Sequence, residues 1–135
     1  MKLFFIIILF IVGACALPKQ PVLTNKESEY FKYLKSQCNC EIRREVNVYV
    51  RKDFRKYPNE EGYYHIIFKN LPCQALLAKD SLAKVAKSVA VNLKNEVIDS
   101  NFIYLYERIT VNFTCYPSID APKTLYFDFK PNELN

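Results

Sequence analysis

The sequence predicts an α+β fold: a four-stranded antiparallel sheet, made of two hairpins, packed on one long helix in the order α-β-β-α-β-β. Three patterns lead to this prediction. Apolar and polar residues alternate in four stretches, and a long stretch between them repeats every three to four residues. Disulfide bonds between cysteines near the ends of these stretches could link them. At 135 residues the chain has room for a single domain.

The first 16 residues have the features of a secretory signal peptide. Lys2 precedes an apolar run from Leu3 to Val12, and Ala14-Cys15-Ala16 forms a small-x-small cleavage site. The run is too short to span a bilayer comfortably. Residues 17–135 would then form one secreted, extracellular domain with no membrane span. The alternative is a bacterial lipoprotein signal, in which Cys15 would carry the lipid.

A capping box and a change of period define the first three elements. Thr24-Asn25-Lys26-Glu27 predicts the start of a short helix that ends near Ser36. From Glu41 to Phe54 polar and apolar residues alternate, which predicts a strand with one buried side. Turn-forming residues at 57–62 lead to a return strand at 63–69, so the two strands are expected to form a hairpin.

The longest apolar stripe predicts the main helix. It begins at Leu71-Pro72, where proline suits the first turn, and runs to Val97, with Asp80-Ser81 as a possible second start. Alternation returns from Phe102 to Cys115 and from Leu125 to Phe129. These two stretches flank a proline-containing turn and predict the second hairpin.

Two charged residues fall on the apolar side of their predicted strands. Arg44 lies among the inward residues of the first strand, and Glu107 lies among those of the third. A buried charge requires a partner of opposite sign. We therefore expect Arg44 and Glu107 to form an ion pair at the edge of the core.

Four cysteines follow the leader, an even number that suits a closed disulfide framework in a secreted chain. Cys38 and Cys40 would point the same way on an extended chain, so each is expected to bond a distant cysteine. One pairing joins Cys40 to Cys73 and Cys38 to Cys115, and the crossed pairing is the alternative. The CxxC pairs of zinc sites are absent, so we predict disulfides and no metal site.

Catalytic motifs are nearly absent. His65 is the only histidine and lies on the outward side of its strand, and no serine occurs in a GxSxG context. Gly13 and Gly62 are the only glycines, which excludes the GxGxxG and P-loop phosphate sites. We predict no catalytic residue and no cofactor. The formal net charge of +5 falls short of the dense basic patches of nucleic-acid-binding proteins.

The most informative feature is a set of aromatic residues on the outward side of the predicted strands. Tyrosine offers apolar area together with a hydroxyl group, a combination that recognition surfaces use. Either this face is exposed and binds a partner, or the N-terminal helix lies across it as a second layer. Phe102 also falls on this outward side. The predicted binding residues are Tyr49, Tyr63, His65, Tyr104, Tyr106 and Tyr126.

Two further features concern the surface. Asn112-Phe113-Thr114 is a glycosylation sequon whose asparagine falls on the outward side. Lys84, Lys87 and Lys94 cluster on the polar side of the main helix, where they could attract anionic glycans or lipid headgroups.

These features favour a secreted, disulfide-stabilised binding protein. It would use the Tyr-rich sheet face, or a groove beside it, to bind an extracellular protein or a small ligand. The alternative is a small secreted hydrolase or protease inhibitor whose site the sequence does not identify.

Overall fold

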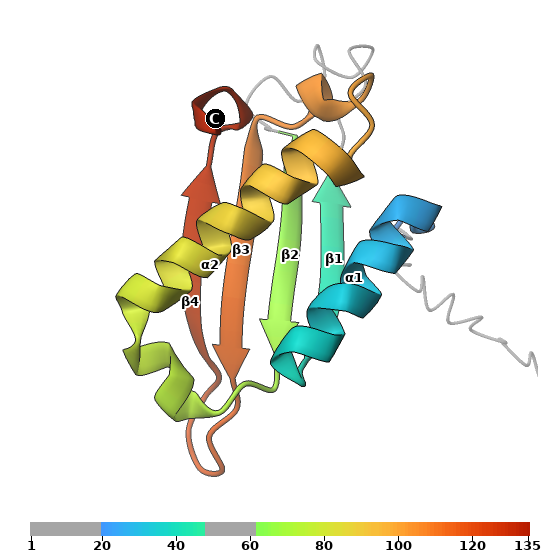
Figure 1. Ribbon diagram of the computed structural model, residues 1–135. Coiled ribbons are helices and arrows are strands. Elements are labelled where there is room, and N and C mark those ends of the chain that lie inside the picture. The colour runs from blue at the N-terminus through green and yellow to red at the C-terminus, as the bar shows by residue number, and fades with distance from the viewer. Residues whose placement is uncertain (1–19, 48–61) are drawn as a thin grey trace, which may run out of the picture.

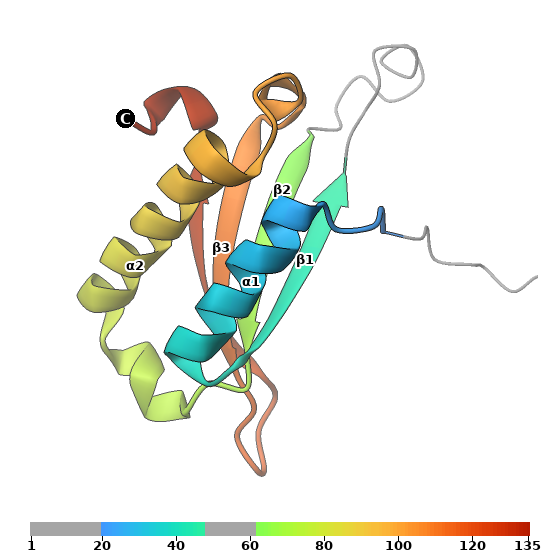
Figure 2. The same cartoon turned by 45° about the vertical axis from the view of Figure 1, so that its right-hand side comes forward.

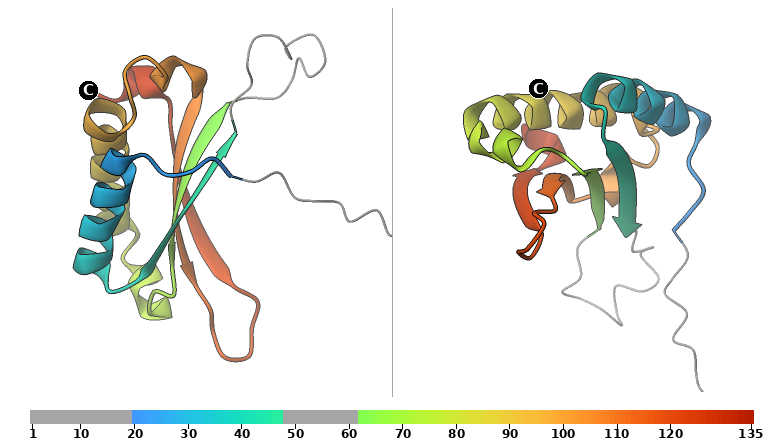
Figure 3. Two further views of the ribbon diagram at one scale, coloured as in Figure 1. Left: turned by 90° about the vertical axis from the view of Figure 1, so that its right-hand side faces the viewer. Right: turned by 90° about the horizontal axis from the view of Figure 1, so that it is seen from below.

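The computed structural model describes residues 20–47 and 62–135. Its sheet has the strand order β1-β2-β3-β4, and two helices, α1 and α2, lie side by side on one of its faces (Figure 2; Figure 3, left). The fold is therefore α+β. The helices are α1 (Asn25–Cys38) and α2 (Lys79–Asn92), and the strands are β1 (Glu41–Asn47), β2 (Tyr63–Lys69), β3 (Arg108–Cys115) and β4 (Lys123–Phe129).

The sheet is mixed, which corrects the prediction of a purely antiparallel one. β1 pairs with β2 and β3 with β4 in antiparallel fashion, but β2 and β3 run parallel, with Tyr63 level with Arg108. The cause is the helix between them: α2 carries the chain back to the end of the sheet where β2 began (Figure 1). Its 14 residues span about 21 Å, close to the length of a seven-residue strand. Such a crossover joins parallel strands.

The long apolar stripe folds into three segments instead of one long helix. A 3₁₀ helix, η1, covers Cys73–Leu77, and a π-helical turn, η2, continues α2 over Leu93–Val97. Ala78, with φ −83° and ψ 56°, separates η1 from α2. The possible second start at Asp80-Ser81 lies in the first turn of α2.

The core lies between the helices and the face of the sheet that they cover. Leu93, the first residue of η2, and Phe31 of α1 are both buried against that face. The sheet contributes residues of one parity, as the alternation predicted. These buried residues are Ile42, Val46, Tyr64, Ile66, Phe68, Ile109, Val111 and Phe113.

Helix α1 begins at the predicted capping box. The Thr24 hydroxyl accepts a hydrogen bond from the Glu27 backbone N–H at 3.2 Å, and the Glu27 carboxylate accepts one from the Thr24 N–H at 2.7 Å. The helix packs on β1, on the same side of the sheet as α2 (Figure 3, right). The alternative in which it covers the Tyr-bearing face is therefore wrong.

The disulfides join Cys38 to Cys40 and Cys73 to Cys115, which differs from both predicted pairings. The prediction assumed an extended chain at Cys38 and Cys40. Cys38 instead ends α1, and Asn39 adopts the left-handed conformation, with φ 49° and ψ 41°. This turn brings the two cysteine Cα atoms to 5.1 Å, within bonding range.

Candidate functional site

The structure divides the predicted binding residues between two places. We call the face of the sheet turned away from α1 and α2 the open face. On it lie Tyr63, His65 and Tyr126. In a turn before β3 lie Tyr104 and Tyr106. The remaining residue, Tyr49, falls outside the described part of the chain.

The turn before β3 replaces the first part of a predicted strand. The backbone N–H groups of Phe102 and Ile103 both donate to the Asp99 carbonyl, at 2.8 and 3.1 Å, and the Asp99 carboxylate accepts from the Asn101 N–H at 2.8 Å. The 3₁₀ turn that follows, η3 (Ile103–Leu105), is closed by hydrogen bonds from the Leu105 N–H to the Phe102 carbonyl at 2.9 Å and from the Tyr106 N–H to the Ile103 carbonyl at 3.1 Å. The alternation from Phe102 onward therefore does not reflect a strand.

Gly62 fixes η3 against the start of β2. A Cβ atom on Gly62 would lie 2.0 Å from the Leu105 carbonyl oxygen, so only glycine allows this approach. The Gly62 carbonyl also accepts a hydrogen bond from the Glu107 N–H at 2.9 Å. Glu107 itself is exposed, which corrects its predicted place on the inward side.

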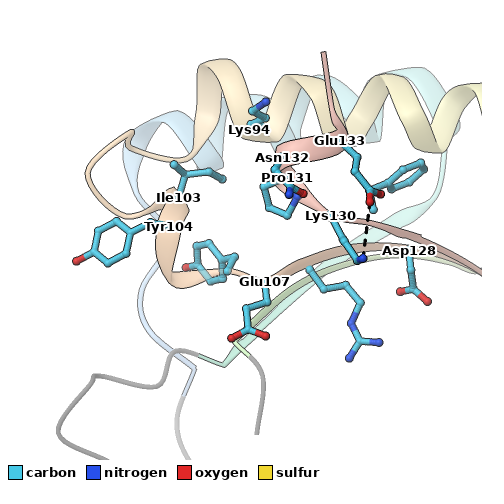
Figure 4. Close-up of a pocket in the computed structure, with 12 residues that line it drawn as sticks. Lys94, Ile103, Tyr104, Glu107, Asp128, Lys130, Pro131, Asn132 and Glu133 are labelled. Atoms are coloured by element: carbon cyan, nitrogen blue, oxygen red, sulfur yellow. Dashed lines mark ion pairs between the residues drawn. The ribbon is translucent and has the colours of Figure 1, made fainter. Parts of the chain in front are cut away.

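A pocket of about 750 Å³ lies beside η3. It is open to solvent and is lined by η3, the first residue of β3, the end of β4 and a C-terminal 3₁₀ turn, η4 (Pro131–Glu133). Figure 4 shows Ile103 and Tyr104 on one side and η4 on the other, with Lys94 above them. The aromatic rings that line the pocket are those of Tyr104, Tyr106 and Phe129. Two predicted binding residues thus meet here.

The two tyrosines of the pocket have different surroundings. Tyr104 is 71% exposed and forms part of the rim. Tyr106 is half-buried, and its ring makes an edge-to-face contact with Tyr64, with ring centroids 5.4 Å apart. Burial, and then the negative charge of Glu27, raise the pKa of Tyr106 above its ordinary value. Tyr106 is therefore a fixed, neutral wall of the pocket.

Of the residues that the structure describes, equal numbers of each charge sign line the pocket. Lys130 Nζ lies 3.7 Å from Glu133 Oε1, the ion pair drawn in Figure 4. Lys94 Nζ donates to the Leu134 carbonyl and so ties the C-terminal turn to η2. The charged lining residues in the described part of the chain are Lys94, Arg108, Lys130, Glu107, Asp128 and Glu133.

Lys94 does not belong to the surface lysine cluster that the sequence predicted on the main helix, because its ammonium group is already hydrogen-bonded. Its ammonium group reaches the C-terminal turn, whereas Lys84 and Lys87 are exposed on α2. Two exposed lysines on one helix are an ordinary solvated surface. The attraction of anionic glycans or lipids stays a prediction, and it would depend on Lys84 and Lys87 without Lys94.

A buried charged cluster supports the wall of the pocket from behind. Arg44 pairs with Glu27 and not with Glu107, which corrects the predicted ion pair. Tyr64 Oη donates to Glu27 Oε1 at 2.7 Å. Burial alone would raise the pKa of Glu27, but hydrogen bonds from Tyr64, the Thr24 N–H and Arg44 together lower it below its ordinary value.

The open face is more polar than the predicted Tyr-rich surface. The strand register places Glu45, His65, Thr110 and Asp128 in one row across all four strands, and Thr110 Oγ1 donates to Asp128 Oδ1 at 2.6 Å. The Tyr63 and His65 rings stack, with centroids 4.2 Å apart. Burial lowers the pKa of His65 despite the nearby acids.

The row of Glu45, His65, Thr110 and Asp128 on the open face was considered as a metal-binding site. Within residues 20–47 and 62–135, no group of three or more His, Cys, Asp or Glu side chains is arranged to hold a metal ion. The same part of the chain contains no helix long and apolar enough to cross a membrane.

Asn112, the sequon residue, lies in the middle of the open face. It is on the outward side of β3, as predicted, opposite Tyr126 of β4. The residue is nevertheless only 6% exposed, and its Oδ1 is buried without a hydrogen-bond partner. A glycan on Asn112 would therefore have to displace its neighbours on the open face.

Comparison with known proteins gives this chain no relatives: it matches no protein-family model, no curated protein and no solved structure. The fold and the pocket are consequently the basis for any statement about function.

Proposed function

We propose that this protein is an extracellular binding protein that takes a small ligand into the pocket beside η3. The volume of the pocket carries the proposal. About 750 Å³ falls within the range of roughly 300–1,000 Å³ that is typical of small-ligand sites. Such sites combine aromatic walls with a few fixed polar groups, and here Tyr104, Tyr106 and Phe129 supply the walls.

The charges around the pocket favour a neutral ligand. Among the described residues, three basic and three acidic side chains line it, so the fields of these six partly cancel. Lys130 is already paired with Glu133, and Lys94 already donates to a carbonyl. A charged ligand would have to compete with these contacts. The expected ligand has one apolar face for the tyrosine rings and hydrogen-bonding groups at its edge.

Three probes that share a phenyl ring test both the place and the charge preference. They are phenyl glucoside, which is neutral, phenyl phosphate, which is anionic, and phenethylammonium, which is cationic. We expect NMR spectra of protein with labelled tyrosines to show the largest shifts with phenyl glucoside, at Tyr104 and Tyr106. Shifts confined to Tyr63 and Tyr126 would place binding on the open face and contradict the proposal.

Secretion is part of the same proposal. Paired cysteines are consistent with an oxidising compartment, and the features of residues 1–16 support cleavage of a signal peptide there. Glycosylation at Asn112 would occur on the unfolded chain, since the folded side chain is buried. Mass spectrometry of protein secreted from eukaryotic cells tests both: we expect an N-terminus at Leu17 and an Asn112 glycan that an amidase removes.

A further inference from the structure

The two disulfides close rings of very different size. Cys40 lies two positions after Cys38 in the sequence, whereas Cys115 lies 42 positions after Cys73. A disulfide stabilises a protein largely by restricting its unfolded chain, and the effect grows with the length of the closed loop. In that model, opening the short ring changes the folding equilibrium roughly fifty-fold less than opening the long one. We therefore expect the fold to tolerate loss of Cys38–Cys40.

The two disulfides also differ in access and position. Cys38 and Cys40 are both partly exposed at the surface end of α1, and the three residues Gln37, Asn39 and Glu41 around them are exposed. Cys115 is completely buried on the central strand β3. Thiol–disulfide exchange requires a thiolate to reach one of the sulfur atoms. Cys73 is partly exposed as well, so one cysteine of the long ring is partly exposed, whereas both cysteines of the short ring are.

We propose that Cys38–Cys40 is a thiol–disulfide exchange site for thiols of the glutathione class, while Cys73–Cys115 is structural. A thiolate attacks one sulfur of the pair, forms a mixed disulfide and releases the other cysteine as a thiolate. A second thiolate attacks the mixed disulfide and releases the remaining cysteine. Two thiols are thereby oxidised to one disulfide, and the protein disulfide is reduced to a dithiol.

The consequence for the fold is local. Asn39 lies between the two cysteines in the left-handed conformation, and its N–H donates to the Lys35 carbonyl at 3.1 Å at the end of α1. Opening the ring releases this turn. The pocket lies at the opposite end of the sheet from Cys40, beside the start of β3, so exchange does not depend on the proposed ligand site.

The test is reduction of the folded protein by reduced glutathione, followed by alkylation and peptide mass spectrometry. We expect Cys38 and Cys40 to be alkylated or glutathionylated at least tenfold faster than Cys73 and Cys115, with the thermal midpoint falling by only a few degrees. Opening of both pairs together would overturn the proposal. So would a Cys38–Cys40 bond that stays closed until the chain unfolds.

A variant without Cys38 and Cys40 shows which of the two disulfides reacts with an added thiol. Cys38→Ser/Cys40→Ser keeps the Cys73–Cys115 bond, so it should stay folded. We expect the wild-type protein to oxidise dithiothreitol stoichiometrically and the variant to do so at least tenfold more slowly. Equal rates for the two proteins would assign the reaction to Cys73–Cys115 and overturn the proposal.

Discussion

Arg44 and Glu27 form an ion pair that joins β1 to α1, with 2.9 Å between Arg44 Nη1 and Glu27 Oε1 and only 6% and 7% of their side chains exposed. The same carboxylate accepts a hydrogen bond from Tyr64 of β2, whose ring packs edge-to-face on Tyr106. The chain of contacts runs from the first helix to the wall of the pocket. The stability of the pocket thus depends on a buried charge pair.

Loss of one partner of this pair should be costly. In Arg44→Leu the carboxylate of Glu27 stays buried without its cation, and we expect the free energy of unfolding to fall by about 3–5 kcal/mol. Arg43→Leu is the control, because Arg43 is largely exposed and its pair with Glu45 should contribute less than about 1 kcal/mol. Urea unfolding measures both. Similar losses in the two variants would contradict this account.

The ionisation of Glu27 should make the free energy of unfolding depend on pH. Its pKa is lowered in the folded state, so its contribution is present above the unfolded-state value near 4.5 and is lost as the pH falls below it. We expect the free energy of unfolding to decrease between about pH 5 and pH 3 more steeply in the wild-type protein than in Glu27→Gln. Urea titrations across this range provide the comparison. Parallel curves would show that Glu27 does not contribute.

Gly62→Ala should disturb the pocket through the backbone. The added methyl group would lie 2.0 Å from the Leu105 carbonyl oxygen, so η3 must move. We expect a loss of about 1–3 kcal/mol in stability, the range for overpacking, together with changed NMR shifts at Tyr104 and Tyr106. A variant with unchanged pocket shifts would refute the role assigned to Gly62.

His65→Ala should leave the pocket and any activity largely intact, since His65 lies on the open face. Its pKa is lowered by burial, so the wild-type protein should lose some stability as the pH falls below about 6.5, the ordinary value. The variant should lack this step. Activity assays and pH-dependent melts check both points. A drop of several orders of magnitude in an activity, with the fold retained, would make His65 a catalytic residue.

Several parts of the fold could be predicted because burial on one face imposes a period of two. The alternation correctly identified the inward residues of β1 and β2, such as Ile42, Val46 and Ile66. The direction of the neighbouring strand leaves no mark on this pattern, since parallel and antiparallel strands share it. The sequence therefore did not reveal that β2 and β3 are parallel.

The pocket was harder to predict because distant segments form it. Tyr104 and Tyr106 were identified as candidates, but on a strand, because their alternation coincides with the 3₁₀ turn η3. The contribution of η4 depends on contacts such as the one between Lys94 and Leu134, 40 residues apart. No local pattern encodes such a contact. The ion pair between Glu27 and Arg44 also joins distant parts of the sequence, so no local pattern predicts it.

The most direct test of the pocket compares two exposed tyrosines that lie in different places. Tyr104 is 71% exposed at the pocket, and Tyr126 is 65% exposed on the open face, so neither replacement by serine should change the free energy of unfolding by more than about 0.5 kcal/mol. Titration calorimetry with phenyl glucoside should show binding weakened by about 2 kcal/mol in Tyr104→Ser, roughly thirtyfold. Binding by Tyr126→Ser should remain within about threefold of wild type. The reverse result, with Tyr126→Ser weakened and Tyr104→Ser unchanged, would place the binding site on the open face and contradict the account.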